Sequence, residues 1–150
     1  MVKKLLNLRP AGIIALFLVV DTLCLGMGMG VPIFCILFGF VVGWYLALRL
    51  APDPGRHGEA LPRLLCWAAA TAGFTLLELA AIWGRTIPMI FDPTSDFANF
   101  GHPFILYDPK ASFVGWLVLM IVVSPFLQLL STVFGADLTS AFRLRRRSSG

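Results

Sequence analysis

The hydrophobic positions of this 150-residue chain fall into four long blocks. The blocks cover about residues 11–29, 31–49, 62–84 and 112–134. Each approaches the roughly 20 apolar residues that a helix needs to cross the hydrocarbon core of a bilayer. No stretch alternates in the manner of a barrel strand, so helices are the expected spanning form. The pattern predicts an all-α integral membrane protein, a single domain of four transmembrane helices.

A tight hairpin is expected between the first two spans. Residues 26–30 read Gly-Met-Gly-Met-Gly, and glycine tolerates the positive φ angles that a sharp reversal needs. Pro125 is the one proline well inside a span, and we expect it to distort the helix near Ser124. An alternative parse fuses residues 22–48 into one span and leaves 11–20 in the interface, which gives three spans.

Composition supports the membrane class. Charged residues make up 13% of the chain, against about 25% in a soluble domain. Hydrophobic residues make up 58%. This excludes a disordered chain, a disulfide-stapled secreted module and a nucleic-acid-binding domain, and it makes the lipid bilayer the first partner.

Basic residues predict the orientation of the spans. Ten of the twelve lie on alternate connections and at both ends of the chain, and the long 85–111 connection carries only Arg85 and Lys110. This positive-inside pattern predicts both termini in the cytoplasm, most simply at a bacterial-type plasma membrane. Residues 135–150 then form a basic cytoplasmic tail. Its arginines are either plain topology anchors or ligands for anionic lipid headgroups: Arg143, Arg145, Arg146 and Arg147.

Two carboxylates lie well inside the predicted spans, Asp21 and Glu78. From the span ends we place them ~12 Å and ~9 Å deep, at 1.5 Å per residue, both in the outer half of the bilayer. No Lys, Arg or His lies deep inside a span to neutralise them, since Arg49 and Arg63 lie at span ends. Three interpretations stay open: a neutral hydrogen bond that fixes helix packing, proton or cation handling, and docking of a partner's basic group.

Polar and small residues also repeat at helical spacing. The polar stripes are Thr71 and Thr75 on the third span and Ser124, Gln128 and Ser131 on the fourth. Such side chains either hold helices together or line a polar path, and the first is the more common. Gly39 and Gly43 form a G-x-x-x-G step, which serves either self-association or packing within the chain.

The 85–111 connection is long, outer and aromatic, and it is where we expect a partner or ligand to bind. Its Asp-Pro steps are also typical of ordinary turns, and the spacing of its acids with His102 matches no metal motif, so no metal site is predicted. The candidate residues are Phe91, Asp92, Asp96, Phe97, Phe100, His102, Phe104, Tyr107 and Asp108.

The sequence carries no nucleophile elbow, no H-E-x-x-H, no phosphate loop and no Cys-x-x-Cys. No catalytic residue is assigned, and a cofactor stays unknown. The short chain, the lone intramembrane acids and the aromatic loop together favour a non-catalytic subunit or an assembly factor of a larger membrane complex. The alternatives are a small oligomeric transporter or proton-handling protein that uses Asp21 and Glu78, and a membrane-embedded lipid-modifying enzyme.

Overall fold

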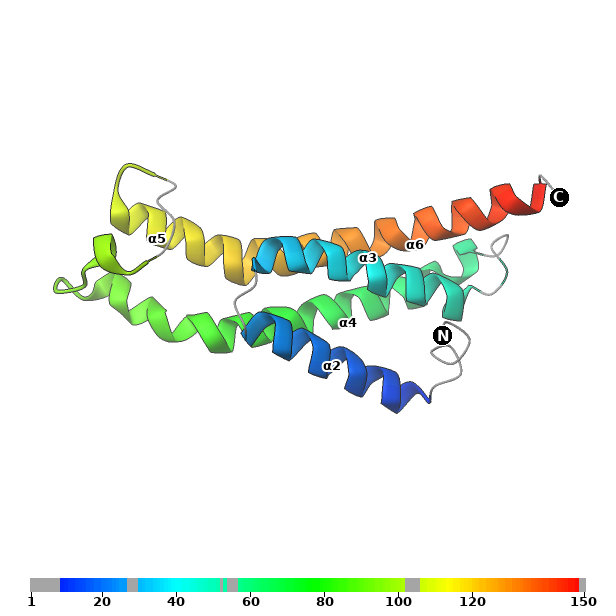
Figure 1. Ribbon diagram of the computed structural model, residues 1–150, viewed down its shortest axis with the longest axis horizontal. Coiled ribbons are helices and arrows are strands. Elements are labelled where there is room, and N and C mark those ends of the chain that lie inside the picture. The colour runs from blue at the N-terminus through cyan, green and yellow to red at the C-terminus, as the bar shows by residue number, and fades with distance from the viewer. Residues whose placement is uncertain (1–8, 27–29, 52, 54–56, 102–105, 149–150) are drawn as a thin grey trace.

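The computed structural model describes residues 9–26, 30–51, 53, 57–101 and 106–148, and all regular elements within these ranges are helical (Figure 1). Along the chain they are α2 (Pro10–Gly26), α3 (Val31–Leu50), α4 (His57–Trp83), the 3₁₀ helices η2 (Gly84–Phe91) and η3 (Phe97–Asn99), α5 (Pro109–Val118), the π-helical segment η4 (Leu119–Val123) and α6 (Ser124–Ser148).

Three helical stretches are long and apolar enough to cross a membrane: Val31–Leu50, Gly58–Phe91 and Pro109–Ser148. The prediction of an all-helical chain is therefore confirmed within the described residues, and these three stretches support the membrane class. α2 is also apolar but has 17 residues, a length of about 26 Å. A fourth crossing by α2 stays a prediction.

The tightest packing joins α3 to α6, and two glycines of α3 allow it. A Cβ on Gly39 would overlap the Ser131 side chain, and a Cβ on Gly43 would overlap the Thr132 carbonyl oxygen. Small residues let membrane helices approach until their backbones touch. Gly39 and Gly43 thus pack within the chain, and a second copy could reach them only if α3 and α6 separated.

The first two helices are separate, as a hairpin requires. α2 ends at Gly26, and α3 begins at Val31 after Gly30, whose φ of 51° and ψ of 55° lie in the left-handed region that favours glycine. The alternative parse, a single helix over 22–48, is therefore wrong. Beside the hairpin, Leu25 and Val31 pack with side chains of α3, α4 and η4.

α2 lies at the edge of the bundle. Only Asp21 and Leu25 of its residues are buried. Phe17 is the main aromatic contact, stacked on Phe38 of α3 with ring centroids 5.3 Å apart and meeting Phe74 of α4 edge-on at 6.1 Å. Towards its beginning the helix slants away from α3 and α4 (Figure 1).

The expected distortion at Pro125 takes the form of a π-helical segment. Proline has no N–H, and its ring clashes with the carbonyl four residues earlier in a regular helix. The chain widens over Leu119–Val123, directly before Ser124 and Pro125. Both the backbone N–H and the hydroxyl of Ser124 donate to the Leu119 carbonyl, the hydroxyl at 2.7 Å. The carbonyl therefore stays satisfied inside the bundle.

The described residues of the 85–111 connection pack against their own chain, at the end of the bundle opposite to the ends of α3 and α6 (Figure 1). η2 continues directly from α4, and the rings of Phe97 and Phe100 pack against Phe113 of α5 at centroid distances of 5.1 and 4.9 Å. Trp83 and Trp116 meet edge to face at 4.6 Å beside them. These contacts form a small aromatic core that links α4 to α5.

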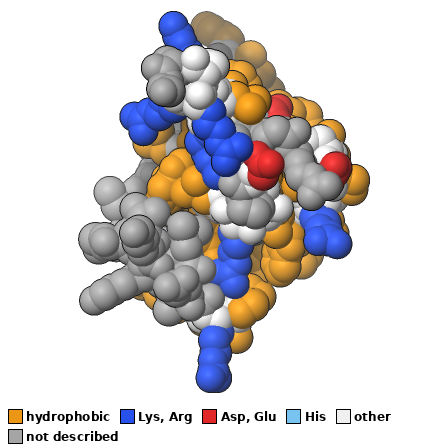
Figure 2. Space-filling model, turned by 90° about the vertical axis from the view of Figure 1, so that its right-hand side faces the viewer, with side chains coloured by type: hydrophobic (Ala, Val, Ile, Leu, Met, Phe, Trp, Pro, Cys, Tyr) orange, Lys and Arg blue, Asp and Glu red, His pale blue; other side chains and the backbone are white. Residues whose placement is uncertain are grey.

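The 135–150 segment, expected as a tail, is helical as far as it is described. α6 runs without a break to Ser148. α3 ends, α4 begins and α6 ends at one end of the molecule, which we call the basic end, and there the arginines gather (Figures 1 and 2).

We expect Gly43→Ala to lower the free energy of unfolding by about 1–3 kcal/mol, because the added methyl meets the α6 backbone and the two helices must move apart. Gly73→Ala on α4 is the matched control, since a Cβ there has nothing within 4 Å. Unfolding in detergent micelles measures both. Equal effects of the two substitutions would contradict the α3–α6 packing.

Candidate functional site

Asp21 of α2 and Glu78 of α4 lie where these two helices meet. Asp21 and Thr75 are fully buried, and the Thr75 hydroxyl donates to Asp21 Oδ2 at 2.7 Å. Glu78, one helical turn further along α4, is near enough to Asp21 to interact electrostatically. Asp21 thus serves as the acceptor of a side-chain bond between two helices.

Other polar groups at this junction are also buried. Asp21 Oδ1 and Glu78 Oε2 have no hydrogen-bond partner within the described ranges. The thiol of Cys35 on α3 is buried and lies within electrostatic range of Asp21. Three helices therefore bring two carboxyls, a hydroxyl and a thiol to one place, which we call the acidic junction (Asp21, Cys35, Thr75 and Glu78). Sequence reasoning missed Cys35, because its neighbour Asp21 lies on another helix.

The remaining stripe residues satisfy their hydroxyls locally. Thr71 donates to the Ala68 carbonyl at 3.0 Å, and Ser131 donates to the Gln128 carbonyl at 3.1 Å. Thr132, a buried residue that the sequence reasoning missed although it continues the i, i+4 spacing from Gln128, donates to the same carbonyl at 2.7 Å. Gln128 is fully buried, and its amide has no partner in the described part of the chain.

A lateral groove of about 520 Å³ opens between α2, α3 and α4. Its lining is almost entirely apolar, with Thr71 as the polar exception. Aromatic side chains from the three helices line it: Phe17, Phe38, Trp44, Tyr45, Trp67 and Phe74. No pattern in the sequence predicts this groove, because the groove depends on the angle at which α2 leaves the bundle.

The candidate residues of the outer loop separate into two groups. Phe97 and Phe100 belong to the aromatic core, whereas Phe91 is 80% exposed and Tyr107 is fully exposed. All four residues are aromatic, so the path of the loop backbone, and not the residue type, decides which rings face the aromatic core. His102 and Phe104 lie outside the described residues.

The acids of this loop cap local turns. Asp92 accepts from the hydroxyl and the amide of Thr94 at 2.7 and 2.9 Å, and these bonds hold the pKa of its carboxyl below the usual value. Asp96 accepts from Asn99, and Asp108 accepts from the backbone of Lys110 at 3.0 Å. In the described ranges, no three His, Cys, Asp or Glu side chains come together to hold a metal ion.

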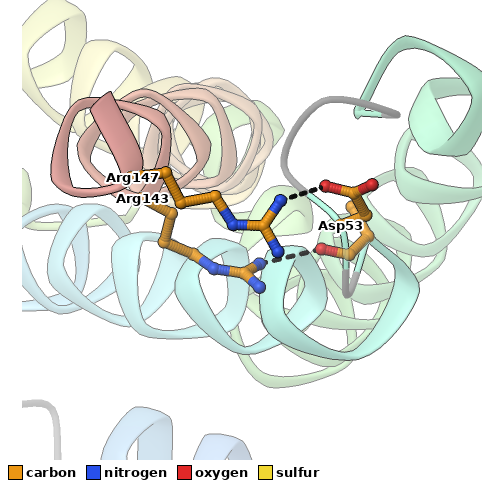
Figure 3. Close-up of polar contacts among 4 residues, drawn as sticks. Asp53, Arg143 and Arg147 are labelled. Carbon is orange, nitrogen blue, oxygen red and sulfur yellow. Dashed lines mark hydrogen bonds and ion pairs between the residues drawn. The ribbon is translucent and has the colours of Figure 1, made fainter. Parts of the chain in front are cut away.

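Arginines of α6 reach across the basic end to the segment after α3. Arg143 donates to the Ala51 carbonyl at 2.8 Å, and Arg147 pairs with Asp53 at 2.7 Å (Figure 3). Arg147 and Asp53 are both exposed, so the pair adds little stability on its own. Together with the Arg143 contact, the pair connects the end of α6 to the segment that follows α3.

No family model, no curated protein and no solved structure matches this chain.

We expect the bond between Asp21 and Thr75 to appear as a coupling energy in a double-mutant cycle. Asp21→Leu and Thr75→Val should each destabilise the protein in micelles, and the double variant should lose less than the sum by about 0.6–1.7 kcal/mol, the range for buried membrane hydrogen bonds. Asp21→Asn keeps the acceptor oxygen and should cost less than Asp21→Leu. Additive effects, with no coupling, would contradict the bond.

Proposed function

We propose that the protein is a non-catalytic subunit or assembly factor of a membrane complex, and that it acts by holding a transmembrane helix of a partner protein in the lateral groove. The groove carries this proposal. It is an apolar surface on three helices, and one of those helices, α2, buries only two of its own residues. Because most side chains of α2 are not buried against its own chain, a large part of its surface can contact another helix.

The chemistry of the groove suits a helix from the bilayer. Helices associate in lipid through close van der Waals packing, and small residues let their backbones approach. Ala70 and Thr71 supply small side chains in the lining, between the large rings of Trp67 and Phe74. The other small-residue surface, Gly39 and Gly43, is already covered by α6. The groove is therefore the better surface for association.

The proposed arrangement in the membrane has four crossings with both termini in the cytoplasm. Its support is the sorting of basic residues, because α3, α4 and α6 bring Arg49, Arg63 and the α6 arginines to the basic end. α2 begins at that end as well (Figure 1). A crossing of about 26 Å by α2 is within the range for a spanning helix.

Photo-crosslinking from the groove tests the partner helix. A photoreactive amino acid at Leu16 or Val41, both exposed in the groove lining, should give an adduct with a transmembrane peptide of one partner protein in the source organism's own membranes. Phe126 and Phe134 are matched controls, exposed on α6 to a similar degree and outside the groove lining. Adducts with lipid alone, or the same protein adduct from α6, would contradict the proposal.

A second candidate function, proton or cation handling, is favoured by the acidic junction. Asp21 is buried and Glu78 partly buried, the two carboxyls lie within electrostatic range, and each has a buried oxygen without a partner in the described structure, so the two could share one cation or proton. If this is the function, reconstituted liposomes should show a cation-dependent or pH-driven flux, and Asp21→Asn or Glu78→Gln should abolish it. Thr71→Val is the control, since its hydroxyl bonds its own helix. Absence of flux in the unchanged protein would exclude this candidate.

A further inference from the structure

The attachment of α2 to the rest of the bundle depends on two buried side chains near its end, Asp21 and Leu25. Leu25 packs in an apolar cluster with side chains of α3, α4 and η4. Asp21 accepts the Thr75 hydroxyl of α4 at 2.7 Å, and it is the only charged residue of α2. A change in the charge of this one side chain therefore acts directly on the attachment of the helix.

Asp21 faces a second carboxyl and no basic group. Glu78 of α4 and the thiol of Cys35 on α3 are the ionisable groups within electrostatic range of it. Within the described residues neither carboxyl forms an ion pair, and Asp21 Oδ1 and Glu78 Oε2 are buried without a hydrogen-bond partner.

A proton shared by the two carboxyls limits the charge at this contact. With one proton on Asp21 or Glu78, at most one negative charge remains, and the Thr75 hydroxyl can still donate to Asp21. With no proton, two negative charges would repel each other where neither has a basic partner. Leaving a charge buried and uncompensated is strongly destabilising. Separation of α2 from α4 relieves both costs, because it lets water reach the carboxylates.

The two carboxyls lie one helical turn from the lateral groove. Phe17 of α2 and Phe74 of α4 line the groove, and Asp21 and Glu78 each follow one of these rings by four residues. The rings of Phe17 and Phe74 meet edge-on, with centroids 6.1 Å apart. Movement of α2 at Asp21 therefore moves Phe17 and the wall of the groove that α2 supplies.

From this geometry we propose that Asp21, Thr75 and Glu78 form a proton-dependent latch, which keeps α2 docked on α4 while the two carboxyls hold a proton and releases it when both are ionised. The docked state binds more protons than the released one, so docking weakens as the pH rises. Release widens the lateral groove. The effect on a partner helix rests on the function proposed above, whereas the latch itself needs no partner and no transport of protons or cations across the membrane.

The distance between α2 and α4 as a function of pH tests the latch. Spin labels at the exposed positions Leu23 and Leu77 are placed in the full-length chain, with its three cysteines replaced by alanine, in lipid nanodiscs. From about pH 5 to about pH 9 we expect a longer distance to appear and grow at the expense of the short one. The ratio of the two populations should rise by up to about ten-fold per pH unit, the limit for release of one proton.

Three substitutions separate the latch from a general effect of pH. Asp21→Asn keeps an oxygen that can accept from Thr75 but cannot ionise, so the ratio should stay within about two-fold over the same range. Glu78→Gln removes the repulsion between the carboxyls, so the ratio should rise less than in the unchanged protein. Asp137→Asn is the matched control, because it removes an exposed acid of α6 and should leave the response unaltered.

A constant distance between α2 and α4 over this range in the unchanged protein would overturn the latch. So would a response that persists in Asp21→Asn, or one of undiminished size in Glu78→Gln. A parallel change between labels at Leu37 of α3 and Leu130 of α6 would show that the whole bundle loosens, and it would overturn the latch as well. The isolated protein is used throughout, so failure of the latch and failure to crosslink a partner helix are separate results.

Discussion

The fold depends on the close contact of α3 with α6, where Gly43 lies against the Thr132 carbonyl with no room for a Cβ. Helices in lipid gain little from hydrophobicity alone, and they need such packing to associate. Ser131 and Thr132 of α6, at this contact, donate their hydroxyls to the Gln128 carbonyl of their own helix, so the close approach leaves both hydroxyls satisfied. α4 packs against this pair, and the space left to α2 is the edge of the bundle.

The peripheral place of α2 connects the structure to the proposed function. Asp21 is the polar contact that ties it to α4, while its first half leaves a groove lined by aromatic rings. The first half of α2 is thus part of the surface that the proposed partner helix would cover.

The sequence was sufficient for the all-helical class, the break between α2 and α3 at Gly30 and a distortion at Pro125, because each follows from local chemistry. It also selected Asp21 and Thr75, since polar residues inside an apolar block stand out. It left the partner of Asp21 open among Glu78, Thr71 and Thr75, because the choice between them depends on how two helices are rotated. The groove and the fold-back of Phe97 and Phe100 depend likewise on crossing angles and loop backbone, which no period in the sequence encodes.

The central claim is that Asp21 holds α2 against a core formed by α3, α4 and α6. Spin labels at Leu23 of α2 and Leu77 of α4 measure the distance between these two helices directly in lipid nanodiscs. Both positions are exposed. With Asp21 in place, we expect one narrow distance distribution. In Asp21→Leu it should broaden and lengthen, while a control pair at Leu37 of α3 and Leu130 of α6 stays narrow. An α2–α4 distribution that is unchanged by loss of the carboxyl would contradict the account.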